Sequence, residues 1–266
     1  MKIGIVGCAG RMGRMLLSEV LNQDGLELAG GTESSGHEVF GEDLGMLAGA
    51  GPQGLLASDD TAALFAAADT VIDFTIPATT QGHAALATKH GTAWVIGTTG
   101  LSPEDQAAVE NAAQKVAVVQ AANMSVGVNV LLGLTEQAAQ LLGEDYDIEI
   151  VEMHHRHKID APSGTALALG KAAAGGRHVD LEKKAVRARD GHTGPRDTGA
   201  IGFATLRGGD VAGDHSVIFA GDGERVELTH KASSRAVFAK GAVRAARWTG
   251  GQPPGLYSMR DVLGFS

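Results

Sequence analysis

The chain has 266 residues, of which 44% are hydrophobic and 20% are charged, a composition that excludes a disordered chain. The net charge of −9 argues against broad nucleic-acid binding. No apolar stretch approaches the length of a membrane span, and the single cysteine, Cys8, excludes an intramolecular disulfide. Because Met1–Gly7 runs directly into a strand and a turn, we expect no signal peptide and a cytoplasmic protein.

The first half of the chain alternates segments typical of buried strands with segments of helical spacing. Strands are expected over Lys2–Val6, Leu26–Ala29, Val71–Thr75, Ala93–Gly97 and Val116–Gln120, and helices over Arg14–Leu21, Ala78–His90 and Pro103–Lys115. This alternation predicts an α/β domain of Rossmann type, with a doubly wound parallel sheet. Gly45–Gly54 is rich in glycine without periodicity, so we expect a connection there.

The pattern changes near Ser125, where a second, α+β domain is expected. Helices are predicted over Val126–Leu142 and Ser163–Ala174, and strands over Asp147–His155, Ala185–Ala188, Ile201–Arg207, His215–Ala220 and Arg225–His230. These strands predict an open mixed sheet. A sheet with few helices has to cover its other face, so we expect self-association. A last helix, Ser234–Trp248, and the tail Leu256–Leu263 are expected to return to the first domain.

A glycine-rich turn follows the first strand and opens the first helix, with the sequence Gly7-Cys8-Ala9-Gly10-Arg11-Met12-Gly13. Glycines at this spacing permit a tight turn and close approach of the backbone to a pyrophosphate, which the helix N-terminus also attracts. Glu33 lies twenty residues after Gly13, where an acid accepts hydrogen bonds from the adenosine ribose. The pattern predicts a dinucleotide site. The alternative is a plain strand–helix turn whose glycines serve packing.

The residues around Glu33 leave the choice of dinucleotide open. Glu33 would repel a ribose 2′-phosphate and so favours NADH over NADPH. Arg11 is near, however, and Ser34 and Ser35 can donate hydrogen bonds to a phosphate. The sequence therefore favours NADH or the use of both cofactors.

Two further loops follow expected strands, Gly97-Thr98-Thr99-Gly100 and Ala121-Ala122-Asn123-Met124-Ser125. Ligands of open α/β sheets bind at the carboxyl ends of the strands, so these loops are expected to wall the nicotinamide half of the cofactor. Ordinary turns and a helix cap are the alternative for either loop alone.

The strongest chemical signal is a basic cluster at the end of an expected strand, Glu152-Met153-His154-His155-Arg156-His157-Lys158. Mutual repulsion disfavours protonating such a cluster unless an anion lies among it. Ser163-Gly164-Thr165 follows at an expected helix start and offers hydroxyl and N–H groups to a carboxylate. We therefore expect a site that holds a small polyanion and moves protons on it.

Other interpretations of this segment stay open. A solvated charged turn is one, and a metal site on His155 and His157 is another, although the neighbouring Arg156 and Lys158 would repel a cation, so we expect no metal. Glu152 either orients a histidine or solvates the strand. Arg235 is either a further anion contact or structural.

The chain resembles the 4-hydroxy-tetrahydrodipicolinate reductase (dihydrodipicolinate reductase) family. The matching runs span the chain in order: Gly7–Gly13 (GCAGRMG), Val71–Thr75 (VIDFT), Val95–Gly100 (VIGTTG), Ala121–Asn129 (AANMSVGVN), Glu152–Thr165 (EMHHRHKIDAPSGT), Gly199–Arg207 (GAIGFATLR) and Thr229–Arg235 (THKASSR). The resemblance implies a homotetramer that uses NADH or NADPH. It also implies a dinucleotide-binding domain of residues 1–125 plus 236–266 and a substrate-binding and oligomerisation domain of residues 126–235.

The resemblance also assigns roles to residues. It implies His154 as the proton donor and acceptor and Lys158 as a second proton donor, with His155, Gly164 and Thr165 as substrate contacts. Cofactor contacts are implied at Gly7–Met12, Glu33, Gly97–Thr99 and Ala121–Met124. Two positions depart from the family pattern: Ser34 stands where an arginine often grips the NADP phosphate, and Met124 stands where an aromatic residue is common.

The family substrate is a cyclic imine with two carboxylates, and its reduction with loss of water in lysine and diaminopimelate biosynthesis is the expected activity. A different Rossmann-fold reductase acting on a small dicarboxylate is the alternative; it would share Gly7–Gly13 but would not explain the basic cluster. Two alternative hypotheses come from other functional classes: a non-catalytic NAD sensor and a metalloenzyme.

Overall fold

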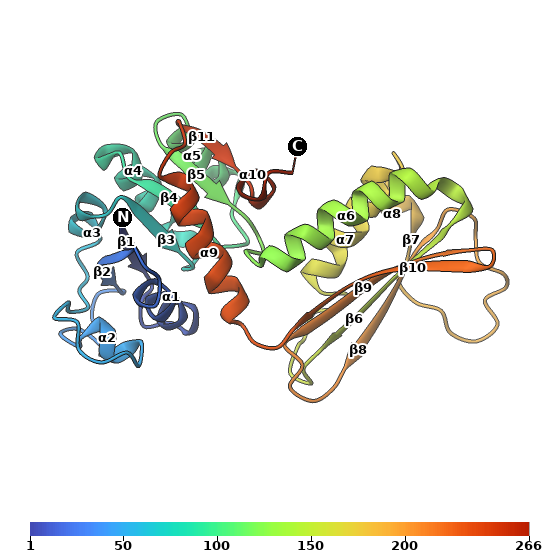
Figure 1. Ribbon diagram of the computed structural model, residues 1–266, viewed down its shortest axis with the longest axis horizontal. Coiled ribbons are helices and arrows are strands. Elements are labelled where there is room, and N and C mark those ends of the chain that lie inside the picture. Colours follow the sequence, from blue (N-terminus) through green and yellow to red (C-terminus); the bar gives the residue numbers. More distant parts are fainter. Residues whose placement is uncertain (266) are drawn as a thin grey trace. The chain divides into compact units, whose positions relative to one another are not determined.

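The computed structural model describes residues 1–265, and the chain divides into two compact units. The first comprises Met1–Val126 and Ala236–Ser266, and the second comprises Gly127–Arg235 (Figure 1). The chain therefore leaves the first unit at 126/127 and returns to it at 235/236.

A six-stranded parallel sheet forms the centre of the first unit. Its strands are β1 (Lys2–Val6), β2 (Glu27–Thr32), β3 (Thr70–Asp73), β4 (Ala93–Ile96), β5 (Ala117–Gln120) and β11 (Gly255–Tyr257), in the order β11-β5-β4-β3-β1-β2. All the pairings are parallel, so the carboxyl ends of the strands meet at one edge. The predicted Rossmann-type sheet is confirmed.

Two separate hydrophobic cores cover the two faces of this sheet. One contains Ile3 and Ile5 of β1 under α1 (Arg11–Leu21), α9 (Ala236–Thr249), α10 (Met259–Leu263) and the short α2 (Leu44–Leu47). The other contains Trp94 under α3 (Thr61–Ala67), α4 (Thr80–His90) and α5 (Pro103–Ala113), with the turn η1 (Pro77–Thr79) leading into α4. Helix α9 brings the C-terminal part of the chain onto the first unit, where it contacts β3, β4 and β5.

A five-stranded mixed sheet forms the second unit, in the order β10-β9-β6-β8-β7. Its strands are β6 (Asp147–His154), β7 (Ala185–Val186), β8 (Ile201–Arg207), β9 (Gly213–Gly221) and β10 (Glu224–Ala232). Strand β6 runs parallel to β8 and antiparallel to β9, which confirms the predicted mixed sheet.

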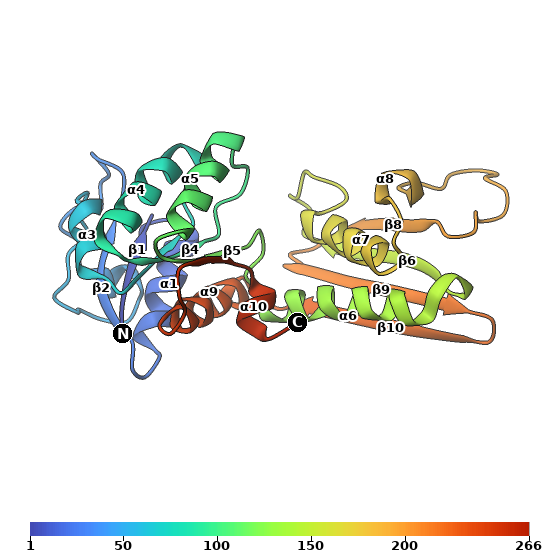
Figure 2. The same ribbon diagram turned by 90° about the horizontal axis from the view of Figure 1, so that it is seen from above.

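Helices cover one face of the second sheet. Figure 2 shows α6 (Val126–Leu142) and α7 (Gly164–Gly176) along that face, and they enclose a core that includes Ile148, Val217 and Phe219. The turn η2 (Gly143–Asp145) and α8 (Leu181–Lys184) complete the unit. No helix in residues 1–265 has both the length and the apolar character needed to cross a membrane.

Several predicted boundaries are wrong by a few residues. Strand β6 ends at His154, one residue before the predicted His155, and His155 and His157 lie in the loop that follows the strand. Helix α1 begins at Arg11, three residues before the predicted Arg14, because Gly10 already serves as its N-cap. The connection Gly45–Gly54 overlaps the short helix α2, which Asp43 caps with hydrogen bonds from the N–H groups of Gly45 and Met46.

Candidate active site

The glycine-rich turn in the first unit has no room for a side chain at Gly13. Gly7 has a φ of +71°, which favours glycine. A Cβ on Gly13 would lie 2.1 Å from the carbonyl oxygen of Gly7, so the first turn of α1 packs directly on the loop. This close packing leaves the backbone of Gly7–Gly13 at the carboxyl end of β1, with the helix N-terminus beside it. The geometry fits a pyrophosphate.

The Glu33 carboxylate lies against this turn. Its Oε2 accepts a hydrogen bond from the Ala9 N–H at 3.2 Å, and its Oε1 accepts one from the Ser34 N–H at 3.1 Å. Ser34 is exposed, and Ser35 donates to a second acid, Asp59, at 3.0 Å. Two carboxylates thus border the position where the pattern places the adenosine ribose.

The predicted cofactor residues gather at the carboxyl edge of the first sheet. They follow β1 (Gly7, Cys8, Ala9, Gly10, Arg11, Met12), β2 (Glu33, Ser34), β4 (Gly97, Thr98, Thr99) and β5 (Ala121, Ala122, Asn123, Met124). The side chains of Cys8 and Met124 are buried in the core, so only their backbone is available to a ligand. Burial, and then the charge of Glu33, raise the pKa of the Cys8 thiol to about 11, so this cysteine is not a nucleophile at neutral pH.

In the second unit, Glu152 is a buried carboxylate at the centre of the predicted basic cluster, with 1% of its surface exposed. Arg207 binds it bidentately, through Nη1 to Oε2 at 2.9 Å and Nη2 to Oε1 at 3.0 Å. The Ser163 N–H donates to Oε1 at 3.0 Å. Although burial opposes ionisation, these bonds and that from His154 hold the pKa of Glu152 below its usual range. Glu152 is therefore ionised at neutral pH.

Glu152 orients His154. The His154 Nδ1 lies 2.5 Å from Glu152 Oε2, and since the carboxylate is ionised, Nδ1 carries the hydrogen and donates it. The other nitrogen, Nε2, is therefore the one that can exchange a proton with a ligand. It lies 3.0 Å from where a Cβ on Gly213 would be, so glycine at this position keeps space beside the reactive nitrogen. The arrangement is that of an oriented acid–base histidine.

A second histidine packs against the first. The ring of His215 lies edge-on to that of His154, with 5.1 Å between centroids, and its Nε2 lies 3.1 Å from Ser163 Oγ. Ser163 Oγ also accepts the Ala166 N–H as the N-cap of α7. Burial and then the neighbouring His154 lower the pKa of His215 to about 4, so it stays neutral and the two rings do not compete for charge.

The loop after β6 carries the remaining basic groups. Lys158 Nζ pairs with Asp160 Oδ1 at 2.8 Å, so the ammonium already has one carboxylate partner. Arg207 reaches the same loop and donates to the Asp160 carbonyl oxygen at 2.6 Å. Burial, then the charge of Arg235 and the other basic groups nearby, lower the pKa of His155. Arg235 therefore lies in the electrostatic field of the cluster.

The start of α7 provides the anion-binding part of the site. Ser163 is buried and caps the helix, while Gly164 is exposed and a Cβ there would meet no atom within 4 Å. Gly164 and Thr165 are the first two residues of a thirteen-residue helix, and the positive end of a helix dipole attracts anions. The second unit therefore combines an oriented histidine, a cationic loop and a helix N-terminus, which suits a carboxylate ligand.

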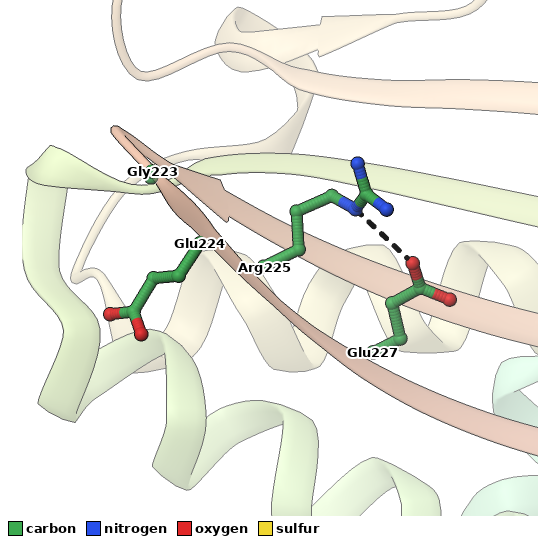
Figure 3. A pocket seen from close by; sticks show the side chains of 5 residues that line it. Gly223, Glu224, Arg225 and Glu227 are labelled. Carbon is green, nitrogen blue, oxygen red and sulfur yellow. Dashed lines mark ion pairs between the residues drawn. The ribbon is translucent and has the colours of Figure 1, made fainter.

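A hollow at the β9–β10 hairpin is separate from this arrangement. Gly221, Gly223, Glu224, Arg225 and Glu227 line it (Figure 3). The Arg225 Nε already pairs with Glu227 Oε1 at 3.4 Å. Gly221 follows Ala220, which pairs with Asp147 at the start of β6. His154 is at the opposite end of that strand. The hollow therefore takes no part in the site.

Two residues of the cluster, Arg207 and His215, were not among those predicted. Both come from neighbouring strands: Arg207 pairs with His154 across β8 and β6, and His215 pairs with Glu152 across β9 and β6. Of the two predictions for Glu152, the structure supports orientation of a histidine. Within residues 1–265 no group of three or more His, Cys, Asp or Glu side chains could hold a metal ion.

Comparison with known proteins gives matches over both parts of the chain. Residues 1–124 match the family described as dihydrodipicolinate reductase, N-terminus, and residues 127–263 match dihydrodipicolinate reductase, C-terminus. The 4-hydroxy-tetrahydrodipicolinate reductase of Afipia carboxidovorans is 56% identical, over 99% of this chain and 97% of the relative. That of Halorhodospira halophila is 55% identical, over 98% of each chain.

The fold is also found among solved structures. A dipicolinate-bound dihydrodipicolinate reductase from Paenisporosarcina sp. TG-14 superposes with a TM-score of 0.76 over 97% of each chain, at 23% identity. At this identity the likeness bears on the fold, and it agrees with a parallel sheet followed by a mixed one.

Proposed function

This chain belongs to the dihydrodipicolinate reductase family, and we propose that its oriented histidine serves the reduction of 4-hydroxy-tetrahydrodipicolinate to tetrahydrodipicolinate, with loss of water. The chain is an NAD(P)H-dependent oxidoreductase of lysine and diaminopimelate biosynthesis. The observation that carries the site assignment is the contact of Glu152 with His154 beside the N-terminus of α7.

The second unit binds the substrate in this proposal. The two carboxylates of the substrate are held by the first turn of α7, through Ser163, Gly164 and Thr165, and by the cationic loop that carries His155. Lys158 exchanges its contact with Asp160 for the substrate and acts as the second proton donor. His154 is the proton donor and acceptor through Nε2, because Nδ1 is held by Glu152.

The first unit binds the cofactor, which supplies the hydride when it is bound. Gly7–Gly13 would hold its pyrophosphate, since Gly13 packs on the turn without space for a Cβ. Glu33 would accept hydrogen bonds from the adenosine ribose. The loops Gly97–Thr99 and Ala121–Met124 would enclose the nicotinamide half, because they end the adjacent strands β4 and β5.

Absorbance at 340 nm with NADH, and then with NADPH, tests the activity when the substrate is made in situ from pyruvate and aspartate semialdehyde by a synthase. We expect oxidation that depends on the synthase. Protein that binds NADH but shows no synthase-dependent oxidation would contradict the reductase assignment and favour another Rossmann-fold reductase acting on a dicarboxylate.

Ser34 is expected to govern the choice between the two cofactors. Glu33 and Asp59 place negative charge where a 2′-phosphate would lie, and no arginine stands at 34 to bind it, so we propose that NADH is used at least as well as NADPH. Ser34→Arg supplies a charge-assisted donor and should raise the kcat/KM ratio of NADPH to NADH by about tenfold. Ser34→Ala is the matched control and should leave the ratio near that of the wild type. An unchanged ratio in Ser34→Arg would refute this role.

We propose that the chain acts in the cytoplasm as a homotetramer, and the uncovered face of the second sheet supports the oligomer. Strand alternation turns Val151, Met153, Leu206 and Ile218 away from α6 and α7, and within residues 127–235 no helix covers them. Leu206 is 49% exposed. Apolar patches of this kind mark interfaces between chains.

A charge on this face should therefore reduce the molecular mass in solution. We expect Ile218→Glu to convert the tetramer into smaller species, measured by light scattering after size exclusion. Leu141→Glu is the control, because Leu141 is an apolar residue of α6 that is 84% exposed. A wild-type monomer at micromolar concentration, or an Ile218→Glu tetramer, would exclude this interface.

A further inference from the structure

Asp73 lies at the point of the first sheet where the order of the strands reverses. It ends β3, paired with Val6 of β1 on one side and Ile96 of β4 on the other. The chain passes from β1 to β2 on one side of β1, and then crosses to β3 on its other side. In α/β sheets the carboxyl ends of the strands at such a reversal are where ligands bind.

A dense set of hydrogen bonds surrounds this carboxylate, which is 1% exposed. Asp73 Oδ2 accepts from His83 Nδ1 at 2.7 Å. Its Oδ1 accepts from the Thr75 N–H at 3.0 Å, the Thr75 hydroxyl at 2.6 Å and the Thr98 hydroxyl at 3.2 Å. Although burial opposes ionisation, the bond from His83 and then those from Thr75 keep the pKa of Asp73 below its usual range. Asp73 is thus a fully paired buried anion.

This carboxylate binds two loops at the carboxyl edge directly and approaches a third through Thr75. Thr98 belongs to the loop after β4, and Thr75 to the loop between β3 and η1. The methyl group of Thr75 in turn faces the glycine-rich turn, since a Cβ on Gly7 would lie 3.0 Å from Thr75 Cγ2. A substitution at Asp73 would therefore alter the conformation of all three loops, although the Asp73 side chain is itself buried.

His83 is itself held in a fixed orientation. It lies on α4 in contact with the aromatic rings of Phe65 and Trp94, with centroid distances of 5.8 Å and 6.4 Å. Packing against two aromatic rings restrains the imidazole, whose Nδ1 is bonded to Asp73. A histidine fixed in this way sets the position of the carboxylate and, through it, that of the threonines.

We propose that Asp73, held by His83, is a positioning residue that keeps these three loops in the arrangement that binds the nicotinamide dinucleotide. The inference rests on the proposed cofactor site and adds residues that do not touch the cofactor. Its chemistry is preorganisation: the donors and backbone that meet the dinucleotide are ordered before it arrives, which removes an entropic cost from binding.

Direct titration of NADH, followed by its fluorescence, tests this separately from catalysis. Asp73→Asn removes the charge with little change of shape, and we expect NADH affinity to fall by about tenfold or more, from the loss of bonds to a charged group. We expect kcat at saturating NADH, and KM for the dicarboxylate, to change far less. Asp69→Asn is the control, since this exposed carboxylate accepts the Lys2 N–H at 2.7 Å at the other end of β3.

A pair of substitutions at His83 separates hydrogen bonding from packing. The amide nitrogen of His83→Asn can occupy the position of Nδ1, whereas that of His83→Gln lies nearer that of Nε2. We expect the Asn variant to bind NADH within about threefold of the wild type, and the Gln variant to bind more weakly than that. A folded Asp73→Asn with wild-type affinity, or equal losses in the two His83 variants, would overturn the proposal. Wild-type protein that binds NADH without reductase activity would instead contradict the proposed function.

Discussion

His154→Gln is expected to lower kcat by roughly 10²–10⁴-fold, the usual contribution of a positioned acid–base group. Glutamine fills a similar volume and can still donate a hydrogen bond, but it cannot give and take a proton as an imidazole does near neutral pH. The affinity for NADH should stay close to that of the wild type, because His154 lies in the second unit. The measurement is the steady-state rate at 340 nm over a range of both substrates.

The matched control for this prediction lies three residues later, in the loop that follows β6. His157 is exposed, and His157→Gln makes the same chemical change outside the contact with Glu152. We expect this variant to keep turnover within about threefold, as surface substitutions away from such features usually have small effects. Full turnover in His154→Gln, or equal losses in the two variants, would show that the reacting proton does not pass through His154.

The fold was predictable where local pattern decides structure. Helix α6 has the predicted bounds because its apolar residues recur at helical spacing. Strand β8 also has the predicted bounds. Helices α2 and α3 were not predicted, since they are short and begin where Asp43 and Asp60 cap them. Helices of four and seven residues show too few turns for a period to be recognised.

The candidate site was predictable only in its contiguous part. Glu152, His154 and Ser163 lie within one short run of sequence, so the sequence alone predicts that they belong to one site. Arg207 and His215 reach the same place only through the pairing of β6 with β8 and β9. Strand register is set by the buried faces of all the paired strands and by their turns, so the sequence of one strand does not show which residues lie opposite it. Asp73 was not predicted for a different reason: it ends a short, otherwise apolar strand whose pattern indicates only burial.

The bidentate contact between Arg207 and Glu152 is the second point where one substitution should have a large effect. Glu152 is 1% exposed and the Arg207 side chain is 21% exposed, so the pair lies largely out of solvent. Removing one partner of a buried pair leaves the other charge without compensation, which usually costs 3–5 kcal/mol. Because Arg207 keeps some solvent contact, we expect the lower end of that range.

Arg207→Met should therefore lower the free energy of unfolding at pH 7 by about 3 kcal/mol, measured in urea at fixed protein concentration. Adding Glu152→Gln should restore part of the loss, because the uncompensated charge is then gone. A double variant less stable than the sum of the two single changes would contradict this explanation.

The pH dependence gives an independent test with a definite sign. In the wild type, Glu152 is buried but its partners hold its pKa below the usual value. Its ionised form therefore stabilises the folded state fully above about pH 4.3, the usual pKa of a glutamate. This stabilisation is lost as the pH falls through the lower pKa of the folded state. In Arg207→Met, burial acts without the strongest of those partners and raises the pKa. The destabilisation should therefore shrink between pH 7 and pH 4, where protonation removes the unpaired charge. A loss that is independent of pH would mean that Arg207 acts through packing and not through the Glu152 carboxylate.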